Sequence, residues 1–248
     1  MVWRCPAVAT LGLVSWAMLG IAPANAHDPI RFDTRRATPG ASIELIEVAP
    51  ATGEAPVKYR LRVSGLPPGQ VYGVWTNEFG HGFHEQASGF RLDESGTLVS
   101  SELDVAGRPR RLDQMTFEPG PLPRGAGWQV AIVSSDRRVT AFAKAIPRPI
   151  AATHGPCTVS LELASRRGDR FIASGSGFMP GEDVTSELTY AGRTGRKTHR
   201  VSPEGRFLSD FIVHGGGGGD QRARYAVKSR ACEVTVEYEW GEGALSER

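Results

Sequence analysis

The stretch that decides the fold reads Ser176-Gly177-Phe178-Met179-Pro180-Gly181-Glu182-Asp183-Val184. A shorter version occurs earlier in the chain, as Ser64-Gly65-Leu66-Pro67-Pro68-Gly69-Gln70-Val71. Each copy follows one segment of alternating apolar and polar residues and leads into another, so each Pro-Gly turn should connect two strands. The repeat therefore predicts a chain built of two similar modules.

The composition is that of an ordinary globular protein whose chain turns often. Of its 248 residues, 40% are hydrophobic and 23% are charged, which suffices for one large core or two smaller ones. Gly 30 and Pro 17 are high counts, and helical periodicity is hard to find. These features favour many short strands joined by turns, and we expect an all-β protein. The formal net charge of +2 and the scattered basic residues give no reason to expect a nucleic-acid partner.

Residues 1–26 are expected to be a cleavable signal peptide. Arg4 supplies a weak positive start, residues 7–21 form an apolar run, and Ala24-Asn25-Ala26 is a small-x-small cleavage site. The alternative is an uncleaved membrane anchor, but the apolar run is short for a bilayer span. We expect a mature chain that starts at His27, is periplasmic or secreted, and has no integral membrane anchor.

The two cysteines of this mature chain are expected to form a disulfide. Cys157 begins a segment whose odd-numbered positions are apolar, and Cys232 begins one whose even-numbered positions are apolar. Each cysteine should therefore lie on the buried side of its strand. In an oxidising compartment this predicts a Cys157–Cys232 bridge between the first and last strands of the second module, rather than two buried thiols.

The boundaries of the modules follow from composition. The first module is expected at residues 27–146, a proline-containing linker at 147–155, the second module at 156–241 and a frayed tail at 242–248. The second module repeats the order of the first, and the turn Ser202-Pro203-Glu204-Gly205 is matched with Glu94-Ser95-Gly96.

About seven short strands per module, with turn signals at regular spacing, are typical of an immunoglobulin-like sandwich. The pattern Gly-Phe-x-Pro-Gly-Glu at residues 177–182, followed by Pro203-Glu204-Gly205, resembles bacterial secreted tandem Ig-like domains. This resemblance implies two tandem immunoglobulin-like β-sandwich domains. Because its motifs specify turns and not chemistry, it implies no activity.

Functional residue types are densest between Trp75 and Glu85. His81 and His84, flanked by Glu78 and Glu85, can hold a divalent copper or zinc ion. Loops at the end of a sandwich also carry binding surfaces, which predicts a binding loop composed of Asn77, Phe79, Phe83 and Glu85. The alternative is that both phenylalanines fold back onto the core and both histidines are solvated.

The first module is also similar to the periplasmic copper-resistance carriers, small sandwiches that begin with His. A mature His27 would offer its amine and imidazole to Cu²⁺. The likeness extends to Pro121-Leu122-Pro123-Arg124-Gly125 and to Ser134-Ser135-Asp136. In that family the residue two positions after the Asp is a His ligand, but here it is Arg138. The likeness therefore requires His81 or His84 to complete the site.

No motif of an enzyme is found in the sequence. It has no Gly-x-Ser-x-Gly, no His-Glu-x-x-His and no phosphate-binding loop, so we expect no catalysis and no obligatory cofactor. The sequence predicts an exported, non-catalytic binding or structural protein of the cell envelope, whose partner is an envelope or extracellular protein or ligand. The alternative is a periplasmic carrier of copper or zinc that uses His27 with His81 or His84.

Overall fold

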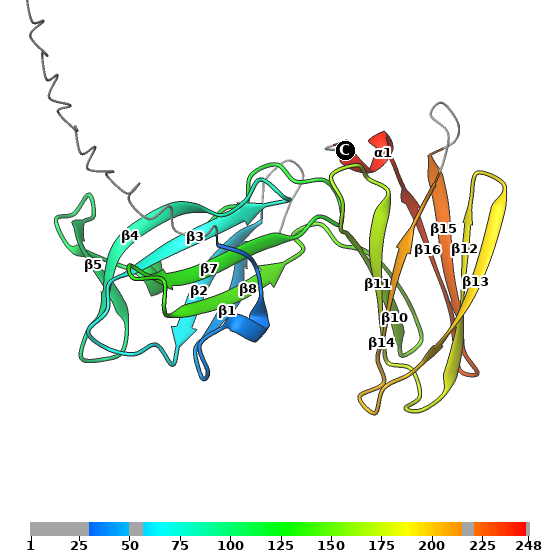
Figure 1. The fold of residues 1–248 in the computed structure, drawn as a ribbon, viewed down its shortest axis with the longest axis horizontal. Coiled ribbons are helices and arrows are strands. Elements are labelled where there is room, and N and C mark those ends of the chain that lie inside the picture. The colour runs from blue at the N-terminus through cyan, green and yellow to red at the C-terminus, as the bar shows by residue number, and fades with distance from the viewer. Residues whose placement is uncertain (1–29, 50–56, 215–220, 247–248) are drawn as a thin grey trace, which may run out of the picture.

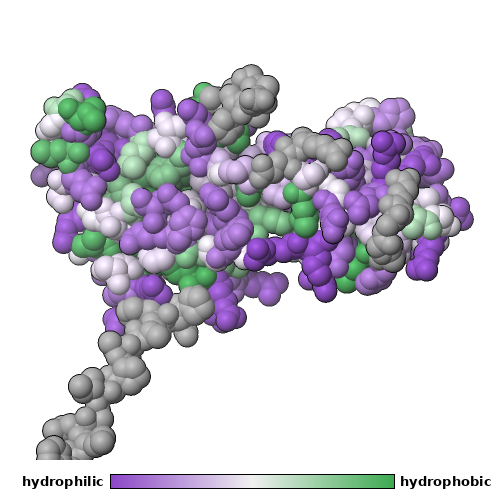
Figure 2. Space-filling model, turned by 90° about the horizontal axis from the view of Figure 1, so that it is seen from above, coloured by the Kyte–Doolittle hydropathy of each residue, from purple (hydrophilic) through white to green (hydrophobic). Residues whose placement is uncertain are grey.

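The computed structural model describes residues 30–49, 57–214 and 221–246. The expected signal peptide and His27 lie outside these residues. The described chain is all-β and forms two sandwiches that lie side by side, as Figure 1 shows. Figure 2, a view from above, shows hydrophilic side chains interspersed with apolar patches on the face of the molecule that is in view. No helix among the described residues is both long and apolar enough to cross a membrane.

The first module consists of a two-stranded and a six-stranded antiparallel sheet. The small sheet pairs β1 (Ser42–Ala49) with β2 (Lys58–Ser64). The large sheet has the order β6-β5-β4-β3-β7-β8. Its strands are β3 (Tyr72–Glu78), β4 (His84–Leu92), β5 (Leu98–Leu103), β6 (Pro109–Arg111), β7 (Trp128–Ser134) and β8 (Thr140–Ala145).

Alternation of side chains along these strands forms the core of the first module. On β2, buried Tyr59 and Leu61 alternate with exposed residues, as expected for a strand with one solvated face. The Tyr59 ring stacks on Trp128 of β7, with ring centroids 5.4 Å apart, which joins the two sheets. Two short 3₁₀ helices, η1 (Thr34–Arg36) and η2 (Leu112–Gln114), complete the module.

The second module is a sandwich of two four-stranded sheets, ordered β14-β11-β10-β9 and β13-β12-β15-β16. Its strands are β9 (Ile150–His154), β10 (Cys157–Leu163), β11 (Arg170–Ser176), β12 (Asp183–Tyr190), β13 (Arg193–Arg200), β14 (Phe207–Ile212), β15 (Arg222–Lys228) and β16 (Glu233–Glu239). From β10 onward the chain places two strands in one sheet, two in the other, one back in the first and two in the second. This is the strand order of an immunoglobulin-like sandwich.

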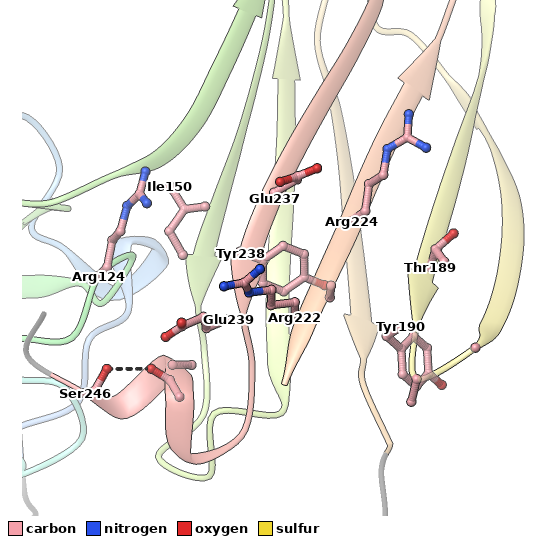
Figure 3. A pocket seen from close by; sticks show the side chains of 15 residues that line it. Arg124, Ile150, Thr189, Tyr190, Arg222, Arg224, Glu237, Tyr238, Glu239 and Ser246 are labelled. Atoms are coloured by element: carbon pink, nitrogen blue, oxygen red, sulfur yellow. Dashed lines mark hydrogen bonds between the residues drawn. The ribbon is translucent and has the colours of Figure 1, made fainter. Parts of the chain in front are cut away.

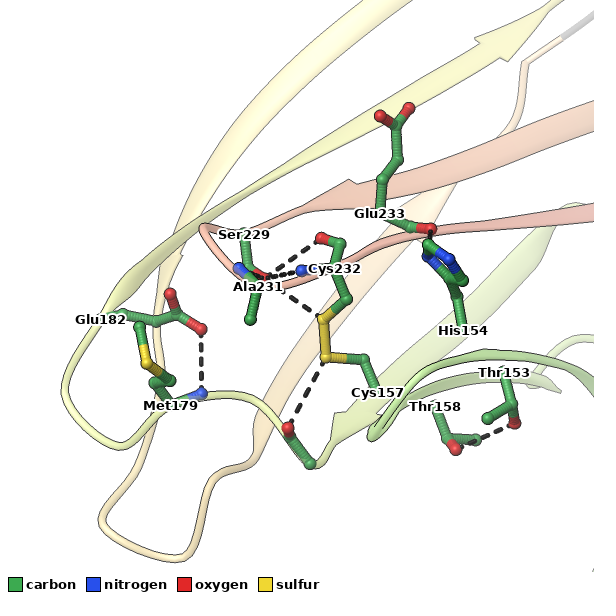
Figure 4. Close-up of a disulfide and its surroundings, with 11 residues drawn as sticks. Thr153, His154, Cys157, Thr158, Met179, Glu182, Ser229, Ala231, Cys232 and Glu233 are labelled. Carbon is green, nitrogen blue, oxygen red and sulfur yellow. Dashed lines mark hydrogen bonds between the residues drawn. A yellow bond between two sulfur atoms is a disulfide. The ribbon is translucent and has the colours of Figure 1, made fainter.

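The expected disulfide is confirmed. Cys157 opens β10 and Cys232 immediately precedes β16, and the two cysteines are bonded across the two sheets, as Figure 4 shows. Both are buried, at 0% and 6% exposure. By the loop-entropy model, a bridge between residues this far apart stabilises the module by about 4 kcal/mol.

The first glycine of each copy of the repeated motif is required for steric reasons. Gly65 and Gly177 both have positive φ angles, of 72° and 78°. A Cβ atom at either position would lie 1.9 Å from a backbone oxygen, that of Gly40 in the first copy and that of Pro156 in the second. Only glycine fits such a place, so the same close approach of two chain segments recurs in both modules.

Three segments differ from the sequence-based expectations. Within the expected linker at 147–155, Ile150–His154 forms β9, which pairs with β10. The expected frayed tail instead begins with a short helix, α1 (Glu242–Leu245), whose Ala244 is buried. The match between the turns at 94–96 and 203–205 is wrong. The strand after the first turn, β5, pairs with β4 in the large sheet, whereas β14 crosses to pair with β11.

Candidate binding surface at the module junction

The two modules are joined by backbone contacts. Ala126 of the first module forms a parallel β-bridge with Leu163 of β10, and the Leu163 N–H donates to the Gly125 carbonyl at 2.9 Å. The Gly125 N–H in turn donates to the Arg148 carbonyl at 2.7 Å. A Cβ atom at Gly125 would lie 2.7 Å from Cδ1 of Ile150. The chain is therefore closely packed where β9 begins.

Side chains reinforce this junction. Lys144 Nζ of β8 lies 2.6 Å from Glu162 Oε2 of β10, and both side chains are at least two-thirds buried, at 31% and 21% exposure. Phe79 packs against the hydrophobic cores of both modules. Its φ angle of 36° is in the left-handed region, which a phenylalanine rarely adopts, so tertiary packing must hold it there.

A groove of about 650 Å³ lies beside this junction, and we call it the junction groove. It is formed by the β15–β16 hairpin, the β12–β13 turn, helix α1, Ile150 of β9 and Arg124 of the first module, as Figure 3 shows. Its labelled lining residues are Arg124, Ile150, Thr189, Tyr190, Arg222, Arg224, Glu237, Tyr238, Glu239 and Ser246. The groove thus draws on both modules and on the C-terminal helix.

Charges of both signs line the junction groove. Arg222 is opposite Glu239 and Arg224 is opposite Glu237 in the β15–β16 pairing, which places each arginine beside a carboxylate on the same face. The Arg224 guanidinium also donates to Thr235 Oγ1 at 3.3 Å. Arg124 approaches from the first module. These alternating charges suit a ligand that carries both signs.

Aromatic groups form the other part of the groove wall. Burial raises the pKa of the Tyr238 hydroxyl far above its ordinary value, so the group stays neutral and can donate or accept a hydrogen bond. Tyr190 meets Trp240 edge to face, with ring centroids 6.2 Å apart. Within the described ranges, neither the Tyr238 hydroxyl nor Trp240 Nε1 has a hydrogen-bond partner.

The predicted metal ligands are not brought together by the described structure. The Glu78 carboxylate accepts the N–H of Gly120 at 3.1 Å, while His84 Nε2 contacts Gln86 at 2.6 Å and Thr76 at 3.3 Å. His81 is exposed. Across residues 30–49, 57–214 and 221–246, no group of three potential ligands of the His, Cys, Asp or Glu type is found. The metal site with His27 stays a prediction, and the metal content of the purified mature protein would test it.

The predicted binding loop is divided between two places. Asn77 donates to Gln129 Oε1 at 2.9 Å on the large sheet, and Phe79 is held at the junction. Phe83 is directed toward Phe142 of β8, with ring centroids 6.2 Å apart, and Glu85 is exposed. One of the two phenylalanines therefore serves the contact between modules.

In the sequence, Glu237 and Glu239 alternate with apolar residues after Cys232, a pattern that indicates a solvated strand face and gives no sign of a groove. The pairing of Arg222 and Arg224 with Glu239 and Glu237 is visible in the sequence as two alternating charged segments separated by a turn. The contributions of Arg124 and of α1 depend on how the modules pack, and no local pattern indicates them.

Fold and site together define an all-β protein of two immunoglobulin-like sandwiches with a groove at their junction. No family model and no curated protein matches the sequence. Among solved structures, the chain is similar to a tetra-tandem repeat in the extending region of a large adhesion protein, with 12% identity over 81% of this chain and a TM-score of 0.27. The match spans 49% of that protein, about half its length.

A second solved structure is the chicken interferon gamma receptor alpha chain, with 9% identity, 83% coverage of this chain, 99% of that chain and a TM-score of 0.22. The strand order of the two sheets in the second module is what assigns the immunoglobulin-like fold.

Proposed function

We propose that this protein is an exported, non-catalytic binding protein of the cell envelope that holds a partner in the junction groove. The observation that carries the proposal is that one groove is formed by residues of both modules, while the modules are joined by a β-bridge and a partly buried ion pair. Grooves at domain interfaces are favoured places for ligands. A preformed groove also reduces the entropy lost on binding.

The chemistry of the groove indicates the class of partner. The cross-strand pairs of arginine and glutamate offer hydrogen-bond donors and acceptors along the β15–β16 hairpin, and the partly exposed Tyr190 offers aromatic surface. A peptide segment of an envelope or extracellular protein that carries charges of both signs meets these requirements. The disulfide supports export, because such bonds persist in oxidising compartments.

Site-specific photo-crosslinking in the native host tests the proposal. A photoreactive residue at Thr189 or Arg224, inside the groove, should form an adduct of defined mass with a partner. The matched control is Arg206, an exposed arginine of the same module that does not line the groove. The charge reversal Arg224→Glu should reduce the adduct at Thr189 several-fold. Equal labelling at Arg206, or no adduct at either groove position, would count against the groove as a binding site.

A further inference from the structure

The two modules differ at one strand position, and the sequence repeat fixes the comparison. Aligning Ser64-Gly65 with Ser176-Gly177 places β2 of the first module in register with β11 of the second. In the second module, β14 lies antiparallel beside β11, with pairs running from Arg170 opposite Ile212 to Gly175 opposite Phe207. Phe171 faces Phe211 in this ladder, and Phe171 corresponds to Tyr59.

The first module keeps one rung of this ladder. The Tyr59 N–H donates to the Phe117 carbonyl at 2.9 Å, and the Phe117 N–H donates to the Tyr59 carbonyl at 2.8 Å. The residues just before Phe117 do not continue along β2, because Leu112–Gln114 coils into η2. The place that β14 fills in the second module therefore holds no strand among the described residues of the first.

The direction of the backbone groups follows from this single rung. In an antiparallel strand the N–H and C=O groups of alternate residues point to opposite sides. The backbone N–H and C=O groups of Tyr59 point toward Phe117, so those of Leu61 and Val63 point to the same side of β2. The backbone groups of Arg60 and Arg62 point to the other side, toward β1. Within the described parts of the chain, no acceptor meets the N–H groups of Leu61 and Val63. We call these two residues the open edge of β2.

A cavity of about 430 Å³ lies against the open edge. One wall is residues 60–63 of β2, and the other includes the turn at residues 96–98 together with Leu112 and Asp113. Leu61, Leu98 and Leu112 are buried, at 2%, 3% and 2% exposure, and supply apolar surface to the cavity. An apolar side chain of an added strand would lose water here.

We propose that the open edge of β2 binds an extended segment of a partner protein, antiparallel to β2, in the place that β14 takes in the second module. Strand addition to a free sheet edge is a general mode of peptide recognition: the backbone supplies the hydrogen bonds, and alternate side chains supply selectivity.

Charge specifies the partner strand further. Arg60 is exposed on the outer face of β2, and no carboxylate of the described residues pairs with it, whereas Arg62 is held by Glu44 at 2.7 Å. In the second module, Asp210 of β14 lies opposite Ile172, the residue that corresponds to Arg60, so a strand in this place carries a carboxylate at the matching position. The partner strand therefore alternates apolar residues, facing the cavity, with an acidic residue that faces Arg60.

The chain's own neighbouring segment is a poorer occupant. For residues 112–116 to extend along β2, η2 would have to unwind and Leu112 would have to leave the core. Arg111 also anchors this segment through ion pairs to Asp93, at 3.6 Å, and Asp113, at 3.2 Å. These contacts hold η2 beside the cavity and keep the edge open.

Amide hydrogen exchange of the full mature chain tests the proposal. The probe is a synthetic peptide with the sequence of residues 206–213, Arg-Phe-Leu-Ser-Asp-Phe-Ile-Val, which contains β14. In the free protein the amides of Leu61 and Val63 should exchange at least tenfold faster than those of Arg60 and Arg62. Saturating peptide should slow Leu61 and Val63 by at least tenfold and leave Arg60 and Arg62 unchanged.

Matched controls identify the contact. The same peptide, N-methylated at the residues equivalent to Phe207, Ser209 and Phe211, should not protect the open edge, because it lacks the donors. Arg60→Glu should weaken peptide binding three- to tenfold, and Arg91→Glu, an exposed arginine on β4, should not. Three results would overturn the proposal: slow exchange of Leu61 and Val63 in the free chain, no added protection with peptide, or protection confined to β11 and β14.

Discussion

At the scale of single residues, His199 is a buried histidine on β13. It is 7% exposed, its Nε2 lies 2.8 Å from Ser186 Oγ, and its ring stacks on Phe207 with centroids 5.1 Å apart. Burial, and to a lesser extent the charge of Lys197, lowers the pKa of His199 from its ordinary value of 6.5. The folded protein therefore holds this imidazole neutral under conditions in which the unfolded chain would protonate it.

The sign of the pH dependence follows from linkage. Because the unfolded chain binds the proton more readily, the free energy of unfolding should fall as pH drops below 6.5 toward the lowered pKa of His199. Carboxylates such as Glu187 and Asp210, whose pKa values are lowered by their arginine partners, lose their contributions only at more acidic pH. The interval between about pH 6.5 and 5 therefore separates the histidine from these acids.

The variant His199→Gln isolates this effect. At neutral pH it should lose about 1 kcal/mol of stability, through a poorer hydrogen bond to Ser186 and the lost stacking. Between about pH 6.5 and 5 its free energy of unfolding, measured by urea denaturation, should fall less steeply than that of the wild type. Parallel curves for the two proteins would show that His199 does not take up a proton when the chain unfolds.

At the scale of elements, the repeated turn and the disulfide were predictable because each is marked by a pattern in neighbouring residues of the sequence. Only glycine fits the close approach at Gly65 and Gly177, and the parity of apolar residues beside Cys157 and Cys232 fixed the side on which each cysteine lies. The sheet to which the next strand goes was not predictable. Turn signals at 94–96 and 203–205 show where a strand ends, but the partner of β5 or β14 is decided by long-range packing.

Gly175 shows how one residue admits β14 to its place. A Cβ atom at Gly175 would lie 2.0 Å from the ring of Phe207, which is the residue opposite it on β14. Val63 occupies the corresponding position in the first module, where no strand lies on its open side among the described residues. Glycine therefore permits the Phe207 ring to cover the strand in the second module.

The substitution Gly175→Val should displace β14. We expect the free energy of unfolding to fall by about 1–3 kcal/mol, because the valine side chain forces the Phe207 ring from its site. Amide exchange along residues 207–212 should also become faster. Gly195→Val is the matched control, since Gly195 is a strand glycine at which an added Cβ would meet no atom within 4 Å. Equal stability of the two variants in urea would show that the close contact at Gly175 relaxes without cost.

At the scale of the whole molecule, the sequence predicted two modules but not how they pack. The prolines at 147 and 149 indicated a spacer, yet the chain from Arg148 to Ile150 packs against Gly125, and β9 extends the sheet of the second module. Phe79 was predicted for a binding loop because it is apolar within a polar segment. Its contacts with both cores explain the same pattern by burial at the junction.

The junction depends on Gly125, and its substitution is the sharpest test of whether the modules hold one orientation. Gly125 has a φ angle of 82°, and a side chain there would meet Ile150 at 2.7 Å and the Leu161 carbonyl at 3.2 Å. Gly125→Val should therefore break the Leu163 to Gly125 hydrogen bond and separate the modules. Small-angle scattering should then show a larger radius of gyration, and calorimetry should resolve two melting transitions.

Gly69→Val controls for backbone strain, because Gly69 has a φ angle of 80° but an added Cβ there would meet no atom within 4 Å. In both variants the free energy of unfolding should fall by about 1–2 kcal/mol, because valine disfavours the left-handed backbone conformation. Only Gly125→Val should change the scattering curve. If both variants scatter like the wild type, the close packing at Gly125 is not what holds the two modules together.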